Sequence, residues 1–90
     1  MNKVISQYIL SGDRSTLFMP KHSMILTSQI VQSYVHIWVL SDSNDDIVPR
    51  VFEMYNTGDT VYQVENAVYI DTLQFYNGSL VKHLFERIIQ

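Results

Sequence analysis

The chain has 90 residues and no cysteine, which limits it to one domain with neither a disulfide framework nor a thiolate metal site. Its net charge of −3, from nine acidic and six basic residues, argues against a general binder of polymeric nucleic acid. No apolar stretch approaches transmembrane length and the first residues lack a signal-peptide pattern, so neither feature is expected. A chain this short has a small stability margin, and its 47% apolar content can cover a subunit interface as well as a core.

Short runs rich in β-branched and aromatic residues, bounded by turn residues, dominate the chain and predict about seven strands. These strands are expected at residues 4–10, 15–19, 24–40 (two strands that reverse at Gln32 and Ser33), 47–55, 68–76 and 80–89. The second strand ends at Pro20 because proline cannot donate to a central ladder. Residues 60–67 are predicted to form an irregular loop with one helical turn, and a helix from Ser79 is the alternative for the last segment.

The most strand-like run covers residues 34–40, where alternation separates two faces. One face is purely aliphatic and predicts core residues at Val35, Ile37 and Val39. The opposite face is large and partly aromatic, so it suits a second layer, a partner subunit or a ligand. That face carries Tyr34, His36, Trp38 and Leu40.

Two turns divide the second half of the chain. Residues 56–59 (Asn-Thr-Gly-Asp) should break the fifth strand because Asn and Gly tolerate positive φ, and Asn77-Gly78 is the strongest hairpin signal. The sequence therefore predicts an all-β fold, or a β-rich one with one short helical turn, as a single domain over residues 1–90. The expected architecture is a small antiparallel sheet, sandwich or partly open barrel that assembles as an oligomer.

No recognisable constellation of catalytic or metal-ligating residues occurs in the sequence. His22, His36 and His83 lack the short spacing with an acidic partner that a zinc site needs. We interpret them as one loop histidine and two strand histidines that are partly buried and hydrogen-bonded. Nucleophile and phosphate-loop motifs are missing too, so we expect a protein that is not an enzyme and that uses no metal or cofactor.

Several residues have the chemistry to bind a small anionic ligand. The Thr57-Gly58 turn combines a hydroxyl with a glycine amide, which can form a concavity of donors for a phosphate, although a turn that simply needs glycine is the plainer reading. The eleven aromatic residues exceed what one small core can hide, so some of them can stack on a base. The basic residues are dispersed, so at most two or three can converge on one ligand.

Short motifs follow one another along nearly the whole chain in a recognisable order. They are V-I-S-Q-Y at residues 4–8, F-M-P at 18–20, M-I-L at 24–26, a glutamine in the third strand, W-V-L at 38–40, R-V-F-E at 50–53, N-T-G at 56–58, Y-I-D-T at 69–72 and H-L-F-E at 83–86. In this order they resemble a family of small phage-encoded proteins of unknown function. The chain departs from that family at Asp59, where the family pattern has a histidine, so any ligand contact of that histidine is lost or altered.

In size and all-β pattern the chain is also similar to the phage anti-CBASS sponge proteins, which sequester cyclic nucleotide signals of bacterial defence. The resemblance implies a tetrameric, non-catalytic binder of a cyclic dinucleotide such as 3′,3′-cyclic GMP-AMP in the cytoplasm of the infected bacterial host. The residues expected to contact this ligand are Trp38 or Tyr34 (stacking), Lys21 and Arg50 (phosphate), Thr57 with the Gly58 amide (phosphate or base edge), Gln29 (base edge), and Met19 and Pro20 (pocket wall).

Two other functions compete with the sponge hypothesis. A phage protein of this size can instead dock on and inhibit a host protein, through edge strands or the aromatic face of residues 34–40. A hydrolase of small nucleotides is the third possibility, and the lack of any catalytic motif in the sequence argues against it.

Overall fold

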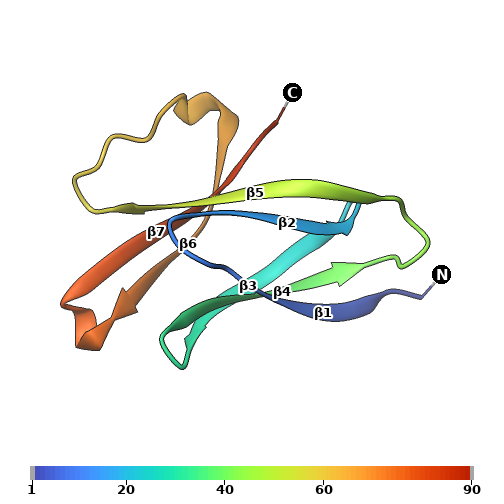
Figure 1. Ribbon diagram of the computed structural model, residues 1–90, viewed down its shortest axis with the longest axis horizontal. Helices are drawn as coiled ribbons and strands as arrows, with labels where there is room; N and C mark the ends of the chain where they lie inside the picture. Colours follow the sequence, from blue (N-terminus) through green and yellow to red (C-terminus); the bar gives the residue numbers. More distant parts are fainter. Residues whose placement is uncertain (1, 90) are drawn as a thin grey trace.

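The computed structural model describes residues 2–89 as two antiparallel sheets that face each other (Figure 1). The strands are β1 (Val4–Ile9), β2 (Arg14–Pro20), β3 (Met24–Val31), β4 (Tyr34–Ser41), β5 (Ile47–Asn56), β6 (Ala67–Phe75) and β7 (Leu80–Arg87). Two short 3₁₀ turns, η1 (Val64–Asn66) and η2 (Tyr76–Gly78), flank β6. The predicted all-β class is confirmed, and the two sheets do not close into a barrel. No helix in the described residues is long and apolar enough to cross a membrane.

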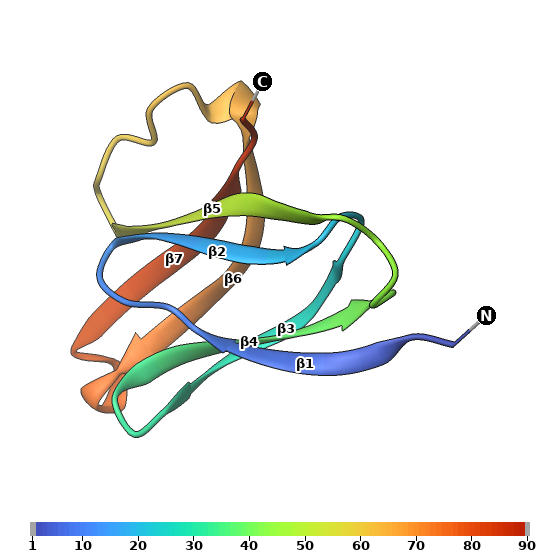
Figure 2. The ribbon, with the colours of Figure 1, turned by 45° about the vertical axis from the view of Figure 1, so that its right-hand side comes forward.

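The order of the strands in the two sheets does not follow their order in the sequence, so the sequence alone does not determine the topology. Sheet A has the order β1-β4-β3, and sheet B has the order β2-β5-β7-β6. The chain therefore crosses from one sheet to the other after β1, β2 and β4, and only the β3–β4 and β6–β7 pairs are hairpins between consecutive strands. Figure 2 shows β2 and β5 running together above β1 and β4, so segments distant in sequence form the two layers.

The β3–β4 hairpin reverses where the sequence predicts. Val31 pairs with Tyr34, and the two residues between them, Gln32 and Ser33, have φ values of 52° and 72°. Positive φ at both central residues is the signature of a type I′ turn, whose twist matches that of the flanking strands. The hairpin is confirmed although neither turn residue is the preferred asparagine or glycine.

The core lies between the sheets and is built from the aliphatic face of β4 and from all four strands of sheet B. Ile37 and Val39 are fully buried, and Val35 is 3% exposed, as alternation predicts. Sheet B contributes Met19, Phe52 and Leu84, which are also completely or almost completely buried. The expectation that Met19 walls a ligand pocket is therefore corrected, because the pleat of β2 turns its side chain into this core.

The end of the chain is a strand and not a helix. β7 pairs with β5 on one side and with β6 on the other, so its backbone bonds go to neighbouring strands and the alternative helix from Ser79 is wrong. Asn77 and Gly78 have φ values of 56° and 90° in the turn that joins β6 to β7, which confirms the hairpin signal. The single turn η1 inside the 60–67 segment confirms the expected helical turn there.

Candidate functional site

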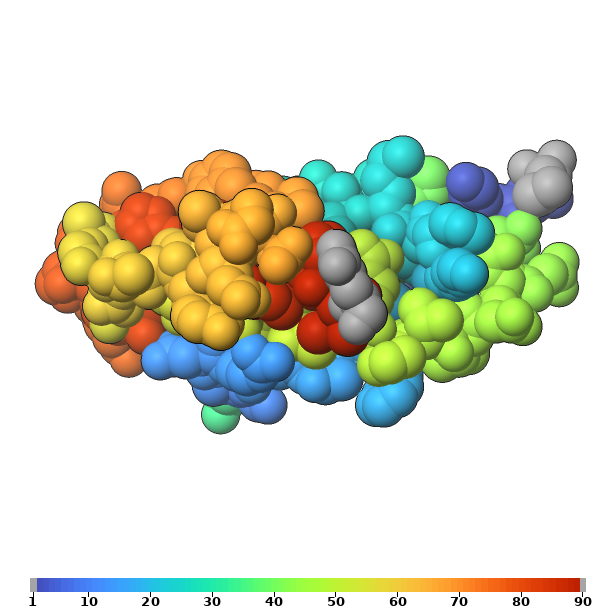
Figure 3. All heavy atoms as spheres, turned by 90° about the horizontal axis from the view of Figure 1, so that it is seen from above, coloured from blue at the N-terminus to red at the C-terminus, as the bar shows by residue number. Residues whose placement is uncertain are grey.

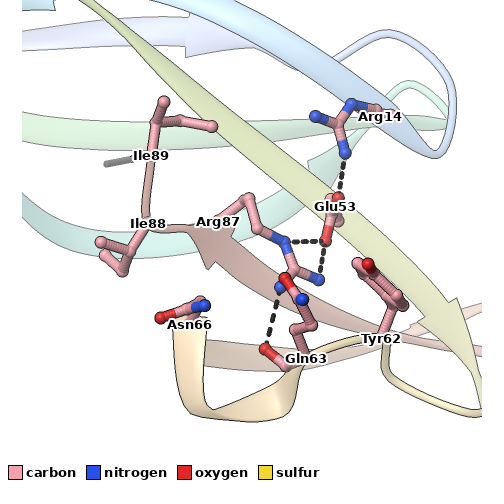
Figure 4. Close-up of a pocket in the computed structure, with 8 residues that line it drawn as sticks. All are labelled: Arg14, Glu53, Tyr62, Gln63, Asn66, Arg87, Ile88 and Ile89. Carbon is pink, nitrogen blue, oxygen red and sulfur yellow. Dashed lines mark hydrogen bonds and ion pairs between the residues drawn. The ribbon is translucent and has the colours of Figure 1, made fainter.

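A hollow of about 350 Å³ opens on the outer face of sheet B, beneath the segment between β5 and β6 (Figure 4). Its walls are Arg14, Glu53, Tyr62, Gln63, Asn66, Arg87, Ile88 and Ile89. Figure 3 shows the segment between β5 and β6 (yellow to orange) beside the C-terminal residues (red) at this surface. The hollow thus lies between one irregular segment, one strand end and the face of the sheet.

The charged side chains of the hollow come from three neighbouring strands. Arg14 of β2 is directly opposite Glu53 of β5, and Arg87 of β7 pairs with Val51, two residues before Glu53. Residues directly opposite each other, or two apart along a strand, project from the same face of a sheet. The register alone therefore places two guanidinium groups beside one carboxylate.

Hydrogen bonds to Glu53 hold this cluster together. Its Oε1 accepts bonds from Nε and Nη2 of Arg87 at 2.9 and 2.6 Å and from the hydroxyl of Tyr55 at 2.8 Å. Its Oε2 is bonded by Nη1 of Arg14. Arg87 also donates from Nη1 to the main-chain oxygen of Gln63 at 3.0 Å, which fixes the segment between β5 and β6 to the sheet.

The protonation states of the cluster follow from these contacts. Burial would raise the pKa of Glu53, but hydrogen bonds from Arg87 and Tyr55 and the charges of Arg87 and Arg14 outweigh it and lower that pKa. Burial and the neighbouring Glu53 carboxylate raise the pKa of Tyr55, so its hydroxyl stays a donor. At neutral pH the hollow therefore holds two positive charges and one negative charge.

The excess positive charge is accessible through Arg14. The Arg14 side chain is 61% exposed, and one of its two terminal nitrogens, Nη1, is bonded to Glu53. The other N–H donors of its guanidinium group remain available to a ligand. Tyr62, Gln63 and Asn66 of the segment between β5 and β6 line the same hollow, and Tyr62 is 68% exposed. An anion can contact the guanidinium while an attached aromatic ring stacks on the tyrosine.

Of the residues that the sequence assigns to phosphate, Arg50 is already engaged elsewhere. Its Nε and Nη2 make a bidentate pair with Glu86 at 2.6 Å each, and its Nη1 donates to the main-chain oxygen of Ser23 at 2.6 Å. Only 18% of its side chain is exposed. A phosphate at Arg50 would have to displace Glu86, so the structure gives this residue a partner within the fold.

The other predicted contact residues fall into three places. Gln29, Tyr34 and Trp38 share the outer face of sheet A, where Gln29 is directly opposite His36 and the His36 ring stacks on Trp38 with centroids 6.1 Å apart. Pro20 and Lys21 lie at the β2–β3 connection, and Thr57 and Gly58 lie in the turn after β5. Figure 1 shows these two connections at opposite ends of the long axis, so one chain does not bring the three groups together.

The turn after β5 has a structural role as well. Gly58 has a φ of 97°, a conformation that favours glycine, and the hydroxyl of Thr57 lies 2.7 Å from Nε2 of His83. The three histidines follow the interpretation from sequence: His22 is in a loop, and the strand residues His36 and His83 are at least partly buried and hydrogen-bonded. Within residues 2–89 there is no group of three or more His, Cys, Asp or Glu that could hold a metal.

Sequence reasoning missed the cluster around Glu53. Arg14 and Arg87 are 73 positions apart in the chain, so they look dispersed in the sequence, and their meeting depends on β5 lying between β2 and β7. One signal was available: R-V-F-E at residues 50–53 and Glu86-Arg87 place opposite charges on opposite faces of two strands. Pairing those strands gives the two crossed ion pairs observed, Arg50–Glu86 and Arg87–Glu53.

Fold and site together define a small antiparallel β-sandwich with one cationic hollow on the outside of its larger sheet. The chain belongs to the family described as Domain of unknown function (DUF7352), which matches it over residues 1–90. Neither the curated proteins nor the solved structures contain a match to this chain. The argument for function therefore rests on the hollow and on the chemistry of its residues.

Proposed function

We propose that this protein binds a cyclic dinucleotide defence signal, such as 3′,3′-cyclic GMP-AMP, and sequesters it without cleavage. In this proposal it is a phage immune-evasion protein that inhibits CBASS signalling in the cytoplasm of the infected bacterium. The observation that carries the proposal is the hollow in which two guanidinium groups share one carboxylate. The motif resemblance to phage proteins supports the same reading.

The hollow offers what one half of a cyclic dinucleotide needs. A phosphate can pair with the exposed donors of Arg14, and a base can stack on Tyr62, a contact typically worth ~1–3 kcal/mol. The amides of Gln63 and Asn66 supply donors and acceptors for a base edge. A volume of about 350 Å³ is at the lower end for ligand pockets, so the second nucleotide extends beyond the hollow or into another subunit.

Sequestration is proposed in preference to hydrolysis because of the state of Glu53. It is the only carboxylate among the residues that line the hollow, and three side chains donate to it. A general base needs a free lone pair within reach of water and a pKa near the working pH. Glu53 has a lowered pKa and occupied oxygens, so it serves better as an anchor for the two arginines.

The test is thermal melting of the purified protein against a panel of cyclic di- and trinucleotides, with Arg14→Gln and Lys21→Gln as a matched pair of charge-removing variants. Ligand at ~100 times its dissociation constant adds about 2.7 kcal/mol to the native state, so the wild type should melt several degrees higher with the right compound. Arg14→Gln should lose most of this shift, and Lys21→Gln should keep it. Chromatography should recover the compound intact.

Three outcomes would count against this proposal. No shift with any compound would remove the sponge function for that panel. A shift that Lys21→Gln loses and Arg14→Gln keeps would move the site to the β2–β3 connection. Cleaved compound after incubation would favour the hydrolase.

A second candidate is a module that docks on and inhibits a host protein. One observation favours it: β1 is an edge strand of sheet A whose residues Val4–Ile9 include no charge and no proline. Natural proteins usually protect such edges, and a free edge can accept a strand from another protein. A defined host protein that binds the nucleotide-free chain, and whose activity falls on binding, would support this candidate.

A further inference from the structure

The outer face of sheet A lacks charged side chains. Cross-strand pairing arranges its outward residues in four rows across the sheet, because directly paired residues share a face. The rows are Ile5–Leu40–Met24, Gln7–Trp38–Thr27, Ile9–His36–Gln29 and Tyr34–Val31. None of these eleven residues is Asp, Glu, Lys or Arg, whereas the outer face of sheet B carries Arg14, Glu53 and Arg87.

Large apolar side chains on this face are open to solvent. Ile5 is 61% exposed, Met24 is 57% exposed and Tyr34 is 60% exposed, and Ile9 and Val31 are also exposed. Ile5 and Met24 flank Leu40 in the first row, and Tyr34 and Val31 form the fourth row, so most of the exposed apolar residues gather at both ends of one face. Exposed apolar surface of this kind marks an interaction site.

We propose that this face is the surface through which two copies of the chain stack, sheet on sheet, in a two-fold dimer. Along the strands, the first and fourth rows consist of large apolar or aromatic side chains, and the second and third rows combine apolar and polar ones. A two-fold axis lying between the second and third rows brings the Ile5 row of one copy onto the Tyr34 row of the other. The same axis places the Trp38 row on the partner copy's His36 row, so like chemistry meets like chemistry.

The centre of the face is already prepared for burial. His36 is only 8% exposed although it points outward, and the amide of Gln7 donates to its Nδ1 at 2.7 Å. Trp38 stacks on the same ring. Covering His36 with a second copy therefore strips little water from it, and its Nδ1 keeps the amide of Gln7 as a partner, which lowers the usual cost of burying a polar side chain.

The size of the face also suits a second copy. Three strands spaced ~4.8 Å apart and about seven residues long give a flat footprint of roughly 350 Å². Side-chain relief raises the accessible area, so two copies together bury on the order of 1,000 Å², which a specific interface requires. Because the face carries no charged side chain, two copies of it do not repel each other electrostatically. It also offers no charge complementarity to a strongly charged partner.

The first test is sedimentation equilibrium of the wild type and two double-lysine variants. Ile5→Lys/Ile9→Lys places four positive charges in the proposed dimer interface, and the matched control Thr16→Lys/Phe18→Lys adds the same charge to exposed positions on the outer face of sheet B. We expect dimers for the wild type and the control and folded monomers, checked by circular dichroism, for the first variant. A monomeric wild type at high concentration, or a variant that stays dimeric, would overturn the proposal.

Trp38 provides a second readout because it is the only tryptophan in the chain and lies on this face. Acrylamide should quench its fluorescence several-fold less in the wild-type dimer than in Ile5→Lys/Ile9→Lys. Equal quenching in a dimeric wild type would show that the copies meet elsewhere, for example at the β1 edge, and would sink the proposal. Nucleotide binding is measured separately, because the hollow is lined by residues of sheet B and of the segments that flank its strands, and not by the proposed interface.

Discussion

Glu53 is a nearly buried carboxylate whose charge is balanced by two arginines and a tyrosine. Removing one partner of a buried ion pair typically costs about 3–5 kcal/mol, because it leaves the other charge buried without compensation. We expect Glu53→Ala to destabilise the protein by about 3 kcal/mol, measured as a lower free energy of unfolding in urea. Arg87, which is 9% exposed, is the charge left behind.

The matched control for this prediction is Arg14→Ala. Its guanidinium also bonds Glu53, but 61% of the side chain is in water, where ion pairs are worth under about 1 kcal/mol. We expect Arg14→Ala to stay within that range. If Arg14→Ala and Glu53→Ala proved equally destabilising, burial would not be what sets the strength of this cluster.

Glu53 also predicts how stability depends on pH. Its pKa in the folded protein lies below the value of an unfolded glutamate, so the native state favours the ionised form. This contribution is fully present above the unfolded pKa and is lost as the pH falls through the folded pKa. Urea unfolding between about pH 7 and pH 3 should therefore show the wild type losing its advantage over Glu53→Gln on the acid side. A constant difference across that range would contradict the assignment.

At the scale of elements, the β3–β4 turn is the clearest place to gain stability. Gln32 and Ser33 both hold positive φ, a conformation that costs an ordinary residue free energy and that asparagine and glycine adopt readily. We expect Gln32→Asn/Ser33→Gly to raise the free energy of unfolding by about 1 kcal/mol, measured by urea or thermal unfolding. No change, or a loss, would indicate that these side chains make stabilising contacts in the turn.

The β6–β7 turn supplies the comparison, since it already has Asn77 and Gly78 at positive φ. Replacing Gly78 by alanine should destabilise the protein by about 1 kcal/mol, because its φ of 90° disfavours a side chain and a new Cβ would lie 3.3 Å from Oε1 of Gln74. The free energy of unfolding should therefore rise when the β3–β4 turn receives the residues that its geometry favours. It should fall when the β6–β7 turn loses one of them.

Local pattern predicted most of these elements because local physics determines them. Alternation identified Val35, Ile37 and Val39 as core, and turn chemistry located the reversal at Asn77. The reversal at Gln32 followed from the two strand-like runs on either side of it. The last segment was harder, since residues 80–87 mix charged and apolar side chains in a string that also fits a helix. The segment forms a strand because it pairs with both β5 and β6, and this pairing is tertiary structure that the local sequence does not encode.

At the scale of the whole molecule, the sequence could not divide the strands between two sheets. β2 joins β5 in sheet B although its neighbours in the chain, β1 and β3, belong to sheet A. That division of the strands determines the site, because it brings Arg14 to Glu53 and pairs Arg50 with Glu86. It also separates Gln29, Tyr34 and Trp38 on sheet A from the predicted contact residues in the loops. Alternation in the sequence indicates the aromatic face of β4 as available surface, whereas the cationic hollow depends on which strands pair.

If two native chains stack through sheet A, the stability of the protein depends on its concentration as well as on its sequence. A ligand that binds only the native state stabilises it by mass action, and here the ligand is the second copy. Each tenfold rise in protein concentration should then add roughly 0.7 kcal/mol per chain, which moves the melting temperature of a domain this size upward by about 3–5 °C. Ile5→Lys/Ile9→Lys should melt at the same temperature at every concentration, while Thr16→Lys/Phe18→Lys should follow the wild type. Calorimetry over a hundredfold concentration range measures all three proteins, and a wild type whose melting temperature stays constant would refute stacking through this face.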